Sequence, residues 1–281
     1  MQIAITGASG FIATSIQKVL KPEQFQFVAL NRNESDEIWI KKLQQCQVVI
    51  NLAGAPVIQR WTKKNRQAIL NSRIQTTRRI VSLLNGMKGG PELLISGSAI
   101  GIYPDSGNEV QNEDSRKTGD GFLTSVVQQW ESEAQQLTNG NIRLIIARIG
   151  VVIGQEGGLL KKTLPLFKMG LGGKIASGEQ ALSFIHINDI VKAFQFFIEN
   201  KGTTGIYNLV APNWVNNAEF TRALARAVHR PAIFPVPAFA LKFLYGKAAQ
   251  IMINGEKVYP KRLLSEGFVF KFPTIEGALK Q

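Results

Sequence analysis

The chain has 281 residues, of which 44% are hydrophobic, with one cysteine, two histidines and a net charge of +13. No apolar run approaches the ~18 residues of a membrane span, and a single cysteine excludes an intramolecular disulfide and a thiolate metal cluster. The N-terminus shows no signal-peptide pattern, so we expect a cytoplasmic, metal-free protein. Because the basic residues are scattered along the chain, we expect neither a nucleic acid nor a membrane as a partner.

Strand and helix patterns alternate along the first two-thirds of the chain. Apolar runs of strand length are followed by segments whose apolar residues have helical spacing. Strands that are apolar on both faces fit a parallel sheet covered on both sides, so the alternation predicts an α/β fold with a Rossmann-type, doubly wound parallel sheet. The expected strands are 2–6, 25–30, 46–54, 92–96 and 142–148, and the expected helices are 10–20, 63–85 and 124–137.

The pattern becomes less regular after Gly154, where glycines cluster. Residues 216–228 still form a clear helical pattern, with Asn216 or Asn217 as its N-cap. We predict a smaller, mixed α/β C-terminal lobe. The expected division is a nucleotide-binding domain over 1–154, to which segments near 184–210 return, and a substrate lobe over 155–281.

The first expected strand leads into a glycine motif. Gly7, Gly10 and Ala13 give G-x-x-G-x-x-A between that strand and the next helix. Such glycines allow a tight turn and a close approach of backbone to a pyrophosphate at the helix N-terminus. The alternative is an ordinary glycine-rich turn, but the position and spacing favour a dinucleotide site.

The end of the second expected strand indicates which dinucleotide. NAD sites place an acidic residue there for the ribose 2′-hydroxyl, whereas this chain has Asn31 and Arg32. A guanidinium suits a 2′-phosphate. We therefore expect NADP in preference to NAD, unless Arg32 is only a solvated loop residue.

Further motifs identify a family resemblance. They are NLAG at 51–54, NSRIQTT at 71–77, ARIGVVIG at 147–154, FIHINDIV at 184–191 and the C-terminal stretch from 207. With the glycine turn, they resemble the short-chain dehydrogenase/reductase superfamily of extended type. Together the motifs resemble its epimerase-like subfamily that has a C-terminal extension and no settled substrate.

The resemblance implies a set of cofactor-binding residues. Arg73 matches a residue that contacts NADP in relatives, although a salt bridge on the helix surface is an alternative for it. The full set is Gly7, Gly10, Phe11 and Ile12 at the pyrophosphate, Asn31 and Arg32 at the adenosine, Leu52, Ala53 and Gly54 beside it, Arg73, and Ile149 at the nicotinamide end.

The sequence departs from the family at the catalytic pair. Active members use a Tyr-x-x-x-Lys pair for proton transfer, but the aligned positions hold Leu123 and Val127, and no such pair occurs anywhere in the chain. Ser98 and Tyr103 follow the fourth strand and are the candidate catalytic residues. We expect both to face a cleft between the two lobes. Their alternatives are a hydroxyl bonded to backbone and a packed aromatic ring.

Three other residues are weighed against structural roles. His186 could be a general acid, but its position before a helix favours structure. Asp189 is expected to cap or order that helix. Trp61 either lines the pocket or packs in the core.

Two functions follow. The first is an NADP-binding epimerase-like or oxidoreductase-like enzyme that acts on an unknown small molecule with a non-standard acid/base. The alternative is a redox sensor or regulatory protein that binds NADP without turnover. A homodimer is one assembly to test.

Overall fold

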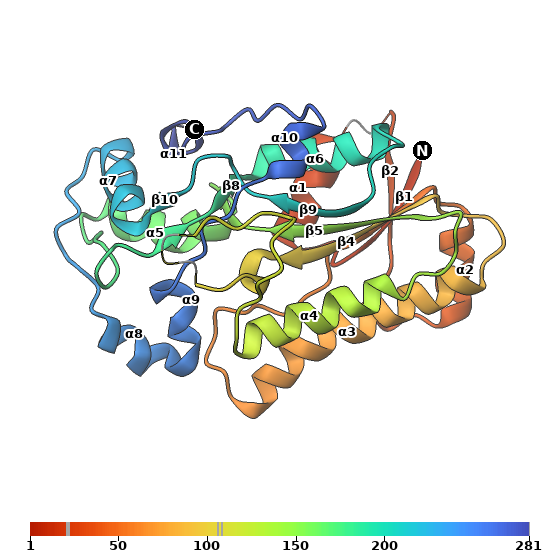
Figure 1. The fold of residues 1–281 in the computed structure, drawn as a ribbon, viewed down its shortest axis with the longest axis horizontal. Coiled ribbons are helices and arrows are strands. Elements are labelled where there is room, and N and C mark those ends of the chain that lie inside the picture. The colour runs from red at the N-terminus through yellow and green to blue at the C-terminus, as the bar shows by residue number, and fades with distance from the viewer. Residues whose placement is uncertain (21–22, 106, 108, 281) are drawn as a thin grey trace.

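A six-stranded parallel sheet organises the molecule. The computed structural model describes residues 1–20, 23–105, 107 and 109–280. The strands of the main sheet are β1 Gln2–Thr6, β2 Gln26–Ala29, β3 Val48–Asn51, β4 Leu93–Ala99, β5 Arg143–Ile149 and β9 Gly205–Leu209. Their order is β2-β1-β3-β4-β5-β9, and all neighbours are parallel. The predicted Rossmann-type α/β fold is therefore confirmed (Figure 1).

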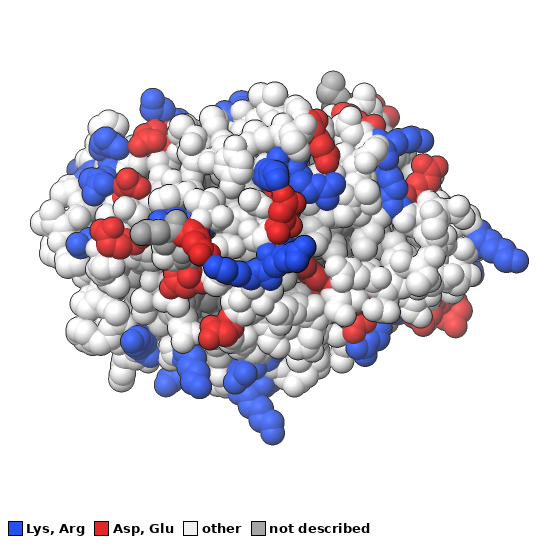
Figure 2. All heavy atoms as spheres, in the orientation of Figure 1, with Lys and Arg blue, Asp and Glu red and all other residues white. Residues whose placement is uncertain are grey.

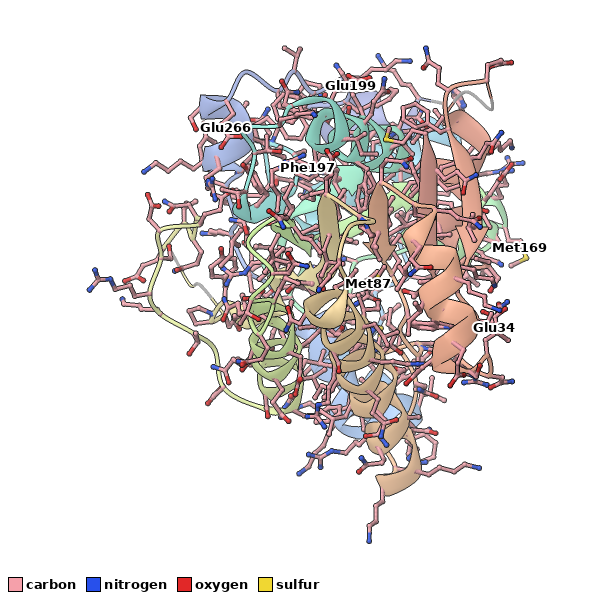
Figure 3. All side chains as sticks on the ribbon, turned by 90° about the vertical axis from the view of Figure 1, so that its right-hand side faces the viewer. Glu34, Met87, Met169, Phe197, Glu199 and Glu266 are labelled. Atoms are coloured by element: carbon pink, nitrogen blue, oxygen red, sulfur yellow. The ribbon has the colours of Figure 1, made fainter. Side chains whose placement is uncertain are left out.

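Helices cover both faces of this sheet (Figure 1). They are α1 Phe11–Val19 and α6 Ile187–Glu199 on one face, and α2 Asp36–Gln44, α3 Lys63–Gly86 and α4 Phe122–Gln135 on the other. Side chains alternate along each strand, so Ile3 and Ile5 pack with α1 and α6, whereas Ala4 packs with α2 and α3. Phe197 of α6 points into the interior (Figure 3).

Helix α2 was not predicted from the sequence. Its nine residues are mostly exposed and carry four charges, so the helical pattern rests on few apolar positions. Trp39 and Leu43 are the two side chains that it buries. The Trp39 indole Nε1 donates to the carbonyl oxygen of Asn31 at 2.9 Å, which fixes the loop after β2 against the helix.

The remaining elements are short, and most of them follow β5 in the chain. They are β6 Val151–Gly154, α5 Gly158–Lys168, β7 Ala181–Leu182, β8 Phe184–His186, β10 Val215–Asn216, α7 Asn217–Ala227, α8 Ala238–Tyr245, α9 Gln250–Ile253, α10 Lys261–Ser265 and α11 Ile275–Leu279, with 3-10 turns at Ile100–Ile102 and Gly246–Ala249. Asn216 is the N-cap of α7 and forms a capping box with Glu219. Among the described residues, no helix is long and apolar enough to cross a membrane.

Candidate functional site

The turn between β1 and α1 has the backbone geometry that the glycine motif predicts. Gly7 has a φ of 65°, and a Cβ there would lie 2.7 Å from the carbonyl oxygen of Leu52. Gly10 N donates to Gly7 O at 2.8 Å. Gly10 is the N-cap residue of α1, and no side chain accepts from the first N–H groups of this helix. The N–H groups of Phe11 and Ile12, in the first turn of α1, therefore have no partner within the helix and suit an anion.

The side chains of Phe11 and Ile149 shape the same edge of the sheet. A Cβ at Gly154 or Gly157 would lie 2.6 or 2.2 Å from the Phe11 ring, so the turn after β6 fits against α1 because both residues are glycine. Ile149 ends β5 and is half-buried against the main core. The carboxyl ends of parallel strands share one edge, which brings these residues near the glycine turn.

Arg73 is held against the loop that follows β3. Its Nη1 donates to the carbonyl oxygens of Ala55 and Ile69, each at 3.1 Å. A Cβ at Gly54 would lie 2.9 Å from the guanidinium carbon, so the glycine makes room for this side chain. The Trp130 ring lies on another side of the Arg73 guanidinium, with 5.3 Å between the ring centroid and the guanidinium carbon.

The charge of Arg73 has no carboxylate partner among the described residues. Burial lowers the pKa of its guanidinium to about 10, which remains well above neutral pH. The alternative of a surface salt bridge is therefore wrong. A half-buried cation without an acidic partner fits a site that receives an anionic ligand.

A buried polar network that the sequence analysis missed lies beneath this loop. Thr6 Oγ1 donates to Asn51 Oδ1 at 2.7 Å, and Asn51 Nδ2 donates to Thr77 Oγ1 at 2.7 Å. Trp130 Nε1 also donates to Thr77 Oγ1, at 2.9 Å. The network ties the ends of β1 and β3 to α3 and α4. Polar residues at the ends of otherwise apolar strands were the available signal.

An acidic residue, Glu34, does lie in the loop that follows β2. The Glu34 carboxylate accepts from the backbone N–H of Asn31 at 3.1 Å and from Lys42 Nζ at 2.6 Å. Hydrogen bonds from Lys42 and Asn31 lower the pKa of Glu34 to about 2. This carboxylate is thus already engaged by protein groups. The Arg32 side chain is exposed and has no hydrogen-bond partner among the described residues, and its backbone oxygen accepts from Arg79. Figure 3 shows Glu34 beside α2.

Ser98 and Tyr103 belong to a buried network and do not face a cleft, so their expected orientation is wrong. Ser98 is 3% and Tyr103 2% exposed. Ser98 Oγ donates to Glu131 at 2.5 Å. Arg148 binds both Glu131 oxygens at 2.8 Å and donates to the Tyr103 hydroxyl at 2.8 Å. Asn208 Oδ1 lies 3.0 Å from the same hydroxyl.

The physical reason is the buried charge pair. Arg148 and Glu131 are each less than a tenth exposed, and such a pair needs further hydrogen-bond partners to satisfy its remaining atoms. Ser98 and Tyr103 supply them. Burial also raises the pKa of Tyr103, against the opposing effect of Arg148. Arg148 and Asn208 were missed, although each is a polar residue inside an otherwise apolar strand.

Leu123 and Val127, which stand where active relatives have Tyr and Lys, lie in apolar surroundings. Val127 is buried in a cluster beneath the loop after β4, with Ile100, Tyr103 and Val210, and Leu123 is half-buried. Neither side chain can exchange a proton.

His186 and Asp189 have structural positions. His186 Nδ1 accepts from Asn188 N at 3.1 Å and caps α6, and burial lowers the pKa of His186 to about 4. Asp189, which was expected to cap or order this helix, lies in its first turn but does not cap it, because His186 is the N-cap. Its two carboxylate oxygens accept from the backbone N–H groups of Lys271 and Phe272 at 2.7 and 2.9 Å, so it holds the C-terminal segment.

Glu256 is a further acidic residue that the sequence analysis missed. Burial raises the pKa of its carboxyl to about 7, and Asp105 adds to the shift. Its backbone oxygen accepts from Ser183 Oγ at 2.6 Å, and the Ser183 carbonyl oxygen would touch a Cβ at Gly150, directly after β5. Glu256 is therefore tied to the loop after β5 and lies near the loop after β4.

Trp61 lines a surface cavity of about 450 Å³ between the first turns of α3 and α4. Its ring contacts Phe122 edge-on, with 5.1 Å between centroids. The cavity does not include Ser98 or Tyr103. Trp61 thus lines a hollow rather than the core.

Comparison with known proteins gives consistent matches along the whole chain. Residues 3–209 match the NAD dependent epimerase/dehydratase family, and residues 236–281 match a domain of unknown function, DUF1731. The chain is 36% identical to epimerase family protein YfhF of Bacillus subtilis over 296 residues, covering all of this chain and 97% of that protein. It is 34% identical to the chloroplastic epimerase family protein SDR39U1 homolog of Arabidopsis thaliana, covering 100% and 86%.

Solved structures agree. The crystal structure of human epimerase family protein SDR39U1 (isoform2) with NADPH has a TM-score of 0.94 and 30% identity, with 100% of this chain and 98% of that chain covered. UDP-glucuronic acid 4-epimerase from Bacillus cereus has a TM-score of 0.79, with 100% and 97% covered, but its 18% identity supports the fold alone.

Proposed function

Because the chain belongs to the NAD dependent epimerase/dehydratase family, we propose that it binds NADP(H) and acts on a small molecule as an epimerase-like or oxidoreductase-like enzyme. The observation that carries the cofactor proposal is the pairing of an anion-accepting glycine turn with the Arg73 cation, which has no carboxylate partner among the described residues. The human relative's structure with NADPH supports the same cofactor. We also propose that the protein acts in the cytoplasm and forms a homodimer. One plant relative is chloroplastic.

The glycine turn fits the pyrophosphate. The N–H groups of Phe11 and Ile12 and the positive end of the α1 dipole favour an anion there. A side chain at Gly7 would occupy the space beside Leu52, and one at Gly10 would lie 3.1 Å from the Gly7 oxygen. The turn therefore keeps its backbone accessible to a ligand.

The loop after β3 would line the cofactor on a second side. Leu52, Ala53 and Gly54 are at most half-buried. Ser72 Oγ accepts from Ala55 N at 2.9 Å, and Arg73 binds the Ala55 oxygen, so α3 fixes the loop before any ligand arrives. Preorganisation of this kind reduces the ordering cost of binding.

Asn31 and Arg32 would contact the adenosine and its 2′-phosphate. Glu34 is paired with Lys42 and Asn31, so it is not free to accept from a ribose hydroxyl. Arg32 supplies a positive charge that suits a phosphate. This arrangement favours NADP(H) over NAD(H).

NADP(H), when bound, supplies a hydride acceptor or donor. The chain must supply the proton transfer, for which Ser98, Tyr103 and Glu256 are the proposed groups. Ser98 Oγ donates its proton to Glu131 and is 3% exposed, so a substrate can reach it only when the buried network opens. A carboxyl with a pKa of about 7 at Glu256 is suited to give and take a proton near neutral pH.

Transfer of label from cofactor tests the enzyme proposal. The protein is incubated with NADPH deuterated at C4 of the nicotinamide and a metabolite extract, and mass spectrometry locates deuterium in the products. We expect transfer by the wild type and a loss of about 10²-fold or more in Ser98→Ala and Glu256→Gln. Glu179→Gln, at an exposed position, is the matched control and should retain the wild-type rate.

The second candidate is a non-catalytic NADP-binding protein. The buried hydroxyls of Ser98 and Tyr103 and the apolar Leu123 and Val127 favour it. If NADPH binds but no deuterium leaves it, and NADP+ oxidises no compound of the same extract, the enzyme proposal is overturned and this candidate takes its place.

A further inference from the structure

Two segments without acidic residues meet at one end of the molecule. Residues 157–178 contain four lysines, residues 220–255 contain five lysines or arginines, and neither contains Asp or Glu. Val236 N donates to the Lys174 oxygen at 2.8 Å, and Ala176 N donates to the Val236 oxygen at 2.9 Å. The two segments thus lie side by side at this point, and we call residues 157–178 and 220–255 together the basic end.

Exposed apolar side chains concentrate on the basic end. It holds eight of the fourteen exposed large hydrophobic residues among those described. Phe239 and Phe243, which are 75% and 81% exposed, lie four residues apart on one face of α8, whereas only Leu241 of that helix is buried. Surface helices normally bury their apolar face. Figure 1 places α8 at the lower edge of the lobe, and Met169 projects outward in Figure 3.

The positive charges of the basic end are almost unneutralised. Of its nine basic residues, only Arg226 forms an ion pair within the described part of the chain, with Glu276 at 3.4 Å. Lys242 and Lys247 are exposed on either side of Phe243. Over α8, Figure 2 shows blue and white atoms. Exposed aromatic rings therefore lie among cations that, Arg226 aside, form no ion pair within the described residues.

We propose that the basic end docks on the surface of an anionic lipid bilayer. Phe239, Phe243 and Leu244 enter the boundary between headgroups and acyl chains, and the lysines and arginines contact anionic headgroups. Apolar side chains on one helix face surrounded by Lys and Arg are the combination that binds in this plane. No helix spans the bilayer in this arrangement, so the docking is peripheral.

Charge and shape favour a bilayer over protein partners. A symmetric contact between two copies would bring the same positive surface of each together, and this repulsion opposes a dimer through the basic end. α8 presents its aromatic rings on a projecting helix (Figure 1), which can enter the boundary region of a bilayer. No membrane partner was expected from the sequence because the basic residues are scattered along it. The two acid-free segments are separated by 41 residues in the chain and meet only on folding.

Sedimentation with vesicles tests the proposal. The full-length protein is mixed with vesicles of phosphatidylcholine alone or with about one-third phosphatidylglycerol, at low and high salt. We expect co-sedimentation only with the anionic vesicles, reduced by salt. Phe239→Ser with Phe243→Ser should lower the partition coefficient at least about tenfold, and Lys242→Gln with Lys247→Gln should do the same.

Matched controls remove equivalent groups elsewhere. Ile38→Ser with Val269→Ser removes two other exposed apolar side chains, and Lys41→Gln with Lys88→Gln removes two other exposed charges. These variants should sediment like the wild type. Light scattering without lipid detects a dimer formed through the basic end. Binding of polyglutamate detects a preference for an acidic protein.

Three results would overturn the proposal. The first is no sedimentation with anionic vesicles, and the second is equal loss in the control variants. The third is a dimer, or a polyglutamate complex, that the two serine substitutions in α8 abolish while vesicle binding is unchanged. In that case the basic end is a protein interface.

Discussion

Single residues in this protein acquire their roles from partners far away in the sequence. Ser98 is bonded to Glu131, which lies 33 positions later, and Tyr103 to Asn208, which lies 105 positions later. The sequence identified the two hydroxyls because they follow a strand at the edge where ligands bind. It could not predict their orientation, since that depends on the buried Arg148–Glu131 pair.

Loss of one member of this pair should be costly. Glu131→Gln leaves the Arg148 guanidinium buried without a counter-charge, so we expect the free energy of unfolding to fall by about 3–5 kcal/mol. Glu133 on the same helix pairs with the exposed Arg78, and Glu133→Gln should cost only about 0–1 kcal/mol. Urea denaturation of both variants measures the difference. Equal losses would mean that the buried pair contributes no more than a surface pair.

His186 should make stability depend on pH. Its pKa is about 4 in the folded protein and 6.5 ordinarily, so between these values the unfolded chain binds a proton that the folded chain does not. The contribution of neutral His186 to the free energy of unfolding is therefore fully present above pH 6.5 and declines as the pH falls to about 4. The full effect is on the order of 3 kcal/mol.

His186→Asn isolates this effect, because Asn also caps helices but does not titrate. The wild type should lose more stability than the variant between pH 7 and pH 4, as measured by denaturant midpoints at each pH. Parallel pH profiles for the two proteins would contradict the assignment.

Whole elements were predicted where apolar periodicity is strong. The expected helix 63–85 is α3, Lys63–Gly86, and the buried strands follow the apolar runs. α2 was missed because its sequence is largely charged and only Trp39 and Leu43 anchor it. Asp189 shows a different limit, because a residue in the first turn of a helix resembles a cap whether it binds that helix or a distant segment.

Asp189 should control whether the C-terminal segment stays docked. Asp189→Ala leaves the N–H groups of Lys271 and Phe272 without their acceptor, at about 1–3 kcal/mol for each buried group. We expect faster proteolysis within 268–280, followed by mass spectrometry. Asp120→Ala, at an exposed position on another loop, is the control. Unchanged cleavage in Asp189→Ala would show that other contacts hold the segment.

At the scale of the whole molecule, the parallel sheet was predictable and the surfaces were not. Strand-helix alternation and the handedness of crossovers restrict the topology, so the fold follows from local patterns. The basic end depends on the meeting of 157–178 with 220–255, which no local pattern reveals. The arrangement of groups around Ser98 likewise depends on how strands and loops come together.

The central claim is that the glycine edge of the sheet binds NADP(H) selectively, and calorimetric titration of the wild type with NADPH and NADH tests it most directly. Loss of a guanidinium–phosphate hydrogen bond is worth about 1.5–3 kcal/mol, so NADPH should bind at least about tenfold more tightly than NADH. Arg32→Ala should remove most of this preference, while Arg116→Ala, at an exposed position in another loop, should preserve it. Equal affinities for the two cofactors in the wild type, or binding of neither, would contradict the account.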